Sequence, residues 1–137
     1  MNRKAVLYKT SKDGKREFYI DEINSTELRI FLAKDRANIK KLNYVLEILL
    51  EHPHNIPTDI YDKENFEKGC EKVTAIKLFK GKKNPRIYCQ QYTENGKKVF
   101  VIIASELLEK KKSNSLTSKE KSIIRRVASY QYQLTTE

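Results

Sequence analysis

The chain has 137 residues, of which 34% are charged and 39% hydrophobic, and its formal net charge is +10. This length suits one domain with a buried core, which we expect to span residues 1–137. No apolar run approaches the roughly 18 residues of a membrane-spanning helix. The N-terminus also lacks the apolar stretch of a secretory signal, so we expect a cytoplasmic protein with no membrane partner.

The positive charge is concentrated in the second half of the chain. Residues 1–68 carry 13 Lys and Arg against 12 Asp and Glu, whereas residues 69–137 carry 15 against 6. The basic half also has the patterns of ordered strands and a helix, which distinguishes it from a disordered basic tail. An ordered surface with this excess predicts binding to a polyanion, because contacts with phosphates release condensed counterions.

The chain begins with two short β-type runs, at residues 4–10 and 16–23. Asp13-Gly14 between them is a strong hairpin signal. We therefore expect an N-terminal hairpin over residues 4–23, as an extension of the domain.

Two helical patterns follow the hairpin. Asn24 or Ser25 is expected to cap the first, which buries Leu28, Phe31 and Leu32. The second runs over 39–51, and Pro53 ends it. Its apolar face is formed by Leu42, Val45, Leu46, Leu49 and Leu50. The stretch after it, to residue 70, predicts a loop with one turn of helix.

The pattern then changes to three β-type runs, at residues 73–79, 86–92 and 98–105. Turn-forming residues separate them, which predicts an antiparallel meander. Thr117-Ser118-Lys119-Glu120 is the signature of a capping box, and we expect Tyr130 and Tyr132 to close the helix that it begins. The fold class expected is α+β: a small antiparallel sheet, built from the meander plus an N-terminal strand or hairpin, with two N-terminal helices and one C-terminal helix.

The sequence predicts no metal site and no cofactor. It lacks a carboxylate cluster and a glycine-rich phosphate loop. Cys70 and Cys89 have no CxxC spacing, so we expect reduced thiols in an intracellular protein. His52 and His54 flank a proline at a helix end, where exposure is the ordinary outcome, and a role as general base stays open.

Basic and aromatic residues carry the strongest chemical signal. Arg86 and Tyr88 share one face of a strand, because side chains alternate along it. An arginine between apolar strand residues usually has an anionic partner, and its planar fork suits phosphate. The residues expected to contact RNA are Lys80, Lys82, Lys83, Tyr88, Lys112, Arg125 and Arg126.

RNA can be cut without a metal by three protein groups. One removes the 2′-hydroxyl proton, one stabilises the phosphorane, and one protonates the departing 5′ oxygen. Lys or Tyr can act as the acid or base when neighbouring like charges lower its pKa.

The C-terminal half resembles a known family over about residues 72–132. The stretches 76–81, 85–88, 99–103 and 107–120 are similar to RelE/HigB-like toxins of type II toxin–antitoxin systems, in the RelE/ParE superfamily. The resemblance implies a RelE-like fold and a metal-independent endoribonuclease that cuts mRNA on the ribosome.

The resemblance also implies roles for particular residues. Arg86 would bind the scissile phosphate. Lys110 and Lys111, which follow the last strand, would be catalytic lysines. Tyr130 or Tyr132 would act as acid or base. A cognate acidic antitoxin would be the protein partner. Two other functions stay open: a noncatalytic module of the same fold that binds RNA or protein, and a ParE-like toxin that inhibits gyrase.

Overall fold

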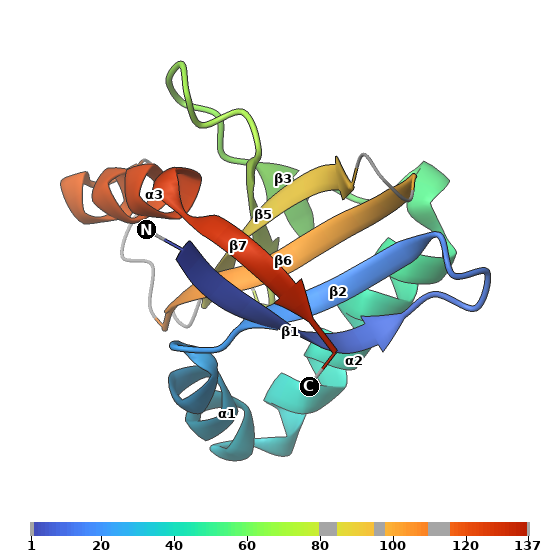
Figure 1. The fold of residues 1–137 in the computed structure, drawn as a ribbon. Coiled ribbons are helices and arrows are strands. Elements are labelled where there is room, and N and C mark those ends of the chain that lie inside the picture. Colours follow the sequence, from blue (N-terminus) through green and yellow to red (C-terminus); the bar gives the residue numbers. More distant parts are fainter. Residues whose placement is uncertain (1, 80–84, 95–97, 110–115, 137) are drawn as a thin grey trace.

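The computed structural model describes residues 2–79, 85–94, 98–109 and 116–136. These residues form a seven-stranded sheet in the order β3-β4-β5-β6-β2-β1-β7. Helices α1 and α2 pack on one face and α3 packs on the other (Figure 1). The elements are β1 (Asn2–Thr10), β2 (Arg16–Asp21), α1 (Ser25–Ala33), α2 (Arg36–Glu51), the 3-10 turn η1 (Pro53–Asn55), β3 (Tyr61–Lys63), β4 (Val73–Lys77), β5 (Arg86–Glu94), β6 (Val99–Leu108), α3 (Ser118–Ser129) and β7 (Gln131–Thr135).

The N-terminal hairpin is confirmed, and its turn has the expected chemistry. Gly14 has a φ of +73°, in the left-handed region that glycine adopts at little cost. The amide of Ser11 donates to the carbonyl of Arg16 at 2.8 Å, which closes the turn. The hairpin is more than an extension, because β2 lies inside the sheet between β1 and β6.

The expected fold class, a small antiparallel and RelE-like sheet, is wrong. The sheet is mixed, because β2 runs parallel to β6 and β1 runs parallel to β7. It is also larger than expected: β3 lies within the stretch expected to be a loop, and β7 lies where the last helix was expected to continue.

The last helix ends earlier than predicted, and the physical reason lies in its final residues. Helix α3 stops at Ser129, and Tyr130 is an extended C-cap residue. Beyond it, Gln131 to Thr135 alternate in exposure with period two, which suits a strand at the sheet edge. Tyr132 therefore belongs to β7, where its register partner is Arg3 of β1.

Helices α1 and α2 cover one face of the sheet, as their apolar spacing predicts. All five residues of the expected α2 face are buried, and they pack with Phe18, Ile76, Ile87 and Ile102 of the sheet. Helix α2 begins at Arg36, before its expected start, because the side chain of Asp35 accepts a hydrogen bond from the amide of Ala37 at 2.9 Å.

Helix α3 covers part of the opposite face. Ile123, Ile124 and Val127 are buried against Val73 and Ala75 of β4, together with Tyr88 of β5. Beyond α3, a smaller apolar cluster continues along this face. It contains Ala5, Tyr19, Val101 and Ile103, with Tyr132 and Leu134 of β7 packed against it.

None of the helices within the described residues is both long enough and apolar enough to cross a membrane.

The predicted capping box at the start of α3 is confirmed. The hydroxyl of Thr117 accepts from the amide of Glu120 at 3.2 Å, and the Glu120 carboxylate accepts from the amide of Thr117 at 2.8 Å. We therefore expect Thr117→Ala to lower the free energy of unfolding by about 1 kcal/mol, measured by urea denaturation. The control is Thr26→Ala, in the first turn of α1, which has no side-chain cap. A loss no larger than that of the control would contradict this role.

Candidate functional site

A polar cavity of about 590 Å³ lies at the end of β6, between the start of α1 and the exposed side of α3. Figure 1 shows α1 and α3 on either side of this end of the strand. The cavity also lies near the start of β5, because Arg86 and Leu108 are register partners. Its charged and hydroxyl-bearing wall contains Glu27, Glu106, Glu109, Lys119, Ser122 and Arg126.

A β-bulge in β6 shapes this wall. Tyr88 of β5 is paired with Glu106, and the next residue, Cys89, is paired with Ala104, so Ser105 has no partner on β5. A bulge of this kind turns two successive side chains toward one side of the sheet. Ser105 and Glu106 consequently both reach toward the C-terminal segment that follows α3.

Glu106 is the centre of one polar cluster. Its two carboxylate oxygens accept hydrogen bonds from Nε and Nη2 of Arg126, both at 2.6 Å. The Tyr130 hydroxyl also donates to Glu106. The side chain of Glu106 is 13% exposed and that of Arg126 is 51% exposed, so the pair lies at the edge of solvent.

These contacts affect the titration of both partners of Glu106. The hydrogen bond to Glu106 is the main reason that the pKa of Arg126 is raised. Burial, followed by the hydrogen bond to Glu106, raises the pKa of Tyr130. At neutral pH this phenol is therefore protonated.

A second polar cluster joins β1, β2, β6 and β7. Asp21 is fully buried and pairs with Arg3, whose Nε lies 2.7 Å from Oδ2. The Tyr132 hydroxyl lies 2.6 Å from the same Asp21 oxygen and 2.9 Å from Oγ of Ser105. Burial raises the pKa of Tyr132, and the bond to Asp21 raises it further. Tyr132 therefore fastens β7 to the sheet and is not among the residues that line the cavity.

Arg86 has the anionic partner that its position predicts. Its Nη1 lies 3.1 Å from the Glu64 carboxylate, and both side chains are nearly buried. The buried Nε of Arg86 has no hydrogen-bond partner among the described residues. Tyr88, two residues along the strand, is fully buried, and its hydroxyl lies 3.5 Å from Glu120. Burial is the main reason that the pKa of Tyr88 is raised.

The two arginines of α3 lie in different surroundings. Arg125 forms a bidentate pair with Glu67, at 2.8 and 3.0 Å, and its guanidinium lies over the ring of Phe66. Arg126 faces the cavity, whereas Arg125 does not line it. The expected lysines lie outside the described residues: Lys80, Lys82, Lys83, Lys110, Lys111 and Lys112.

Several members of these clusters had no role in the sequence analysis. Glu64, Glu106, Asp21 and Arg3 are far along the chain from their partners; Glu64, for example, is 22 residues from Arg86. For Glu106, the sequence signal available was a carboxylate beside Leu107 in a β-type run, which predicts a partner without identifying it.

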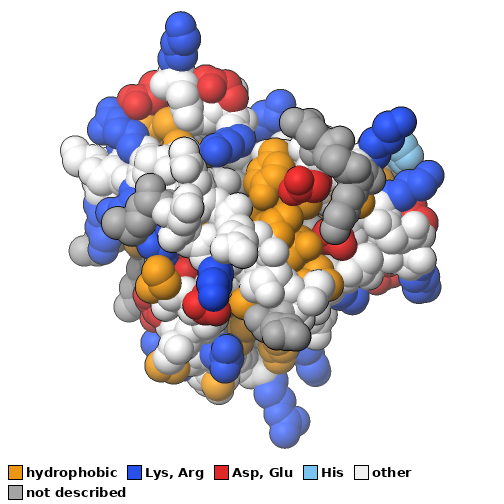
Figure 2. Space-filling model, in the orientation of Figure 1, with side chains coloured by type: hydrophobic (Ala, Val, Ile, Leu, Met, Phe, Trp, Pro, Cys, Tyr) orange, Lys and Arg blue, Asp and Glu red, His pale blue; other side chains and the backbone are white. Residues whose placement is uncertain are grey.

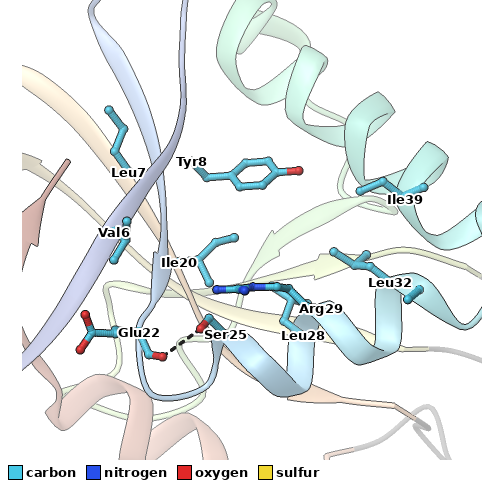
Figure 3. A pocket seen from close by; sticks show the side chains of 11 residues that line it. Val6, Leu7, Tyr8, Ile20, Glu22, Ser25, Leu28, Arg29, Leu32 and Ile39 are labelled. Carbon is cyan, nitrogen blue, oxygen red and sulfur yellow. Dashed lines mark hydrogen bonds between the residues drawn. The ribbon is translucent and has the colours of Figure 1, made fainter. Parts of the chain in front are cut away.

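A separate apolar groove has a volume of about 690 Å³. Val6 and Tyr8 of β1 form one wall, and Leu28 and Leu32 of α1 form the other (Figure 3). Its polar groups include Arg29, Glu22 and Ser25, whose hydroxyl donates to the Glu22 carbonyl at 2.9 Å. This composition suits apolar ligand groups more than acid–base chemistry.

The described residues contain no group of three or more His, Cys, Asp or Glu side chains that could hold a metal ion. Both cysteines are buried free thiols.

Comparison with family models, with curated proteins and with solved structures found no match to this chain.

The buried Arg3–Asp21 pair predicts a large stability effect. Asp21→Ala would leave a nearly buried guanidinium without its carboxylate, so we expect the free energy of unfolding to fall by about 3–5 kcal/mol in urea denaturation. The control is Asp62→Ala, because Asp62 is 44% exposed and lies 3.8 Å from Lys77; there we expect a loss of at most about 1 kcal/mol. Equal losses in the two variants would show that the Asp21 cluster does not hold the sheet together.

Proposed function

We propose that this chain is a metal-independent endoribonuclease that cuts mRNA on the ribosome in the cytoplasm, as the toxin of a toxin–antitoxin pair. One observation carries the proposal. The first residue of β5, Arg86, is the register partner of Leu108 at the end of β6. Pro85 and Glu109, the described residues that flank segments 80–84 and 110–115 in the sequence, therefore precede or follow neighbouring strand ends, and Glu109 lines the polar cavity.

The charge of the chain supports RNA as the ligand. Segments 80–84, 95–97 and 110–115 together contain seven lysines and no acidic residue, and six of those lysines belong to 80–84 and 110–115. Lys119 and Arg126 contribute cations to the cavity wall, which also contains Glu27, Glu106 and Glu109. Phosphate contacts by such residues provide most of the sequence-independent affinity for nucleic acids.

The resemblance of residues 72–132 to RelE/HigB-like toxins supports cleavage rather than binding alone. In this proposal Arg86 is a phosphate-binding group, and its pair with Glu64 holds the guanidinium in place until RNA arrives. Lys110, Lys111 and Lys112 stabilise the charge of the phosphorane, as preorganised cations do in phosphoryl chemistry.

The apolar groove of Figure 3 supports an antitoxin as the protein partner. Apolar side chains of a helix would fill the space between β1 and α1. Acidic residues of the same partner would interact favourably with a chain of net charge +10.

One observation favours a noncatalytic binding module as a second candidate. Arg86, Arg125 and Arg126 each already pair with a carboxylate of this chain. On the face seen in Figure 2, the described Lys and Arg side chains are scattered and do not form one continuous patch. A noncatalytic module would bind RNA in a salt-dependent way and leave it uncut.

The experiment combines the chain with translating ribosomes and maps new transcript 5′ ends. We expect cleavage, and we expect the variant Lys110→Gln/Lys111→Gln/Lys112→Gln to lose most of it. If the three lysines each contact a phosphate, the slope of log K against log salt for single-stranded RNA should fall by about 2.

The matched control is Lys9→Gln/Lys12→Gln/Lys15→Gln, which removes the same charge from exposed residues. These lysines lie at the other end of the sheet, because Arg16 at the start of β2 is paired with Phe100 near the start of β6. Equal effects of the two triple variants would argue against a site at the end of β6. RNA binding without any new 5′ end would favour the noncatalytic module.

A further inference from the structure

We propose that Glu106 and Tyr130 are the general base and the general acid of RNA cleavage, with Arg126 as the group that stabilises the phosphorane. This inference rests on the endoribonuclease function proposed above. The observation behind it is that Glu106 and Arg126, which both line the polar cavity, are joined by hydrogen bonds, and that the Tyr130 hydroxyl donates to the same carboxylate from outside the lining.

Glu106 differs from Asp21 and Glu67, two other carboxylates that pair with arginine, in its exposure and in its neighbours. Asp21 is fully buried, and RNA could not reach it. Glu67 is 38% exposed and has no tyrosine hydroxyl bonded to it in the described part of the chain. Glu106 is partly shielded, lines a cavity, and has a tyrosine beside it.

Tyr130 is held in place from several sides. The side chain of Gln90 donates to the carbonyls of Val127 and Tyr130, both at 2.7 Å, which fixes the corner between α3 and β7. The guanidinium of Arg3 lies 4.0 Å from the centre of the Tyr130 ring. Catalytic groups act best when packing and hydrogen bonds fix their orientation before the substrate binds.

Charged and titratable groups of several elements line the same cavity as Glu106 or pair with it. Helix α3 contributes Arg126 and Lys119, α1 contributes Glu27, and β6 contributes Glu109. The C-terminal segment adds Tyr130, and Tyr88 of β5 is the register partner of Glu106. The cavity wall therefore carries three carboxylates and two cations.

The proposed step balances in protons and bonds. The Glu106 carboxylate takes the proton of the 2′-hydroxyl, and the 2′ oxygen forms a bond to phosphorus. The bond between phosphorus and the 5′ oxygen breaks, and the Tyr130 hydroxyl gives its proton to that oxygen. The protonated Glu106 then returns a proton to Tyr130 through the hydrogen bond between them. The products are a 2′,3′-cyclic phosphate and a free 5′-hydroxyl.

Arg126 can serve the phosphorane because half of its side chain remains exposed. Its hydrogen bonds to Glu106 hold the guanidinium beside the base, where negative charge develops on the phosphate oxygens. A cation fixed in this way needs little reorganisation during the reaction.

The test uses Glu106→Gln and Tyr130→Phe in the full chain, with mRNA on translating ribosomes. We expect each variant to lose at least about 100-fold in cleavage rate, the size typical of a lost acid or base. Both variants should still bind RNA and keep their fold by circular dichroism. The pH profile of the residual activity in Glu106→Gln should lose the limb that rises as a carboxylate ionises. Wild-type products should end in a 2′,3′-cyclic phosphate.

The control is Glu67→Gln, which removes the carboxylate of the neighbouring bidentate pair on α3, and it should cleave at the wild-type rate. If the wild type cleaves and Glu106→Gln stays within threefold of this control, the inference is overturned while the endoribonuclease function stands. If the wild type does not cleave, the proposed function itself fails. If circular dichroism shows that Glu106→Gln has lost its fold, the test uses Tyr130→Phe, which leaves the Glu106–Arg126 pair intact. Cleavage by Tyr130→Phe at nearly the wild-type rate would overturn the proposed acid–base pair.

Discussion

The β-bulge at Ser105 is the local constraint on which the α3 face of this molecule depends. By adding one residue to β6, it turns both Ser105 and Glu106 toward the C-terminal segment. Ser105 then binds Tyr132 of β7, and Glu106 binds Tyr130 and Arg126. The carbonyl of Ser105 also accepts a hydrogen bond from the side chain of Asn24, the N-cap of α1. One irregular position in a central strand thus connects α1, α3 and β7.

The distribution of charge connects this fold to the proposed chemistry. Four of the described arginines, Arg3, Arg86, Arg125 and Arg126, pair with carboxylates of the same chain. Such pairs contribute little net charge but hold their side chains in defined places. Most of the excess charge instead comes from lysines in the segments between the strands and before α3. Orientation and long-range attraction are therefore provided by different residues, which suits a site that must attract a polyanion and then position a single phosphate.

The features that the sequence predicted correctly depend on short-range patterns. The buried face of α2 follows from apolar residues three and four positions apart, the Asp13-Gly14 turn from glycine conformation, and the start of α3 from Thr117 and Glu120. The parallel pairing of β1 with β7 could not be predicted, because it joins residues more than 120 positions apart and leaves no local pattern. The same limit applies to the site: Arg86 and Tyr130 stand out in the sequence, but Glu64 and Glu106 are recognised only once the sheet places them beside these residues.

Tyr130 and Tyr132 show how burial can give different roles to two similar groups. Each hydroxyl donates to a carboxylate, and the pKa of each tyrosine is raised. Asp21, the partner of Tyr132, is fully enclosed and already paired with Arg3, so that cluster can only hold strands together. Glu106, the partner of Tyr130, lines a cavity, and its arginine is half exposed. A substrate that entered this cavity could exchange a proton with Glu106 without disrupting the sheet. The enclosed cluster keeps β7 and the end of α3 in position, and this leaves Glu106 and Tyr130 available for the chemistry proposed for them.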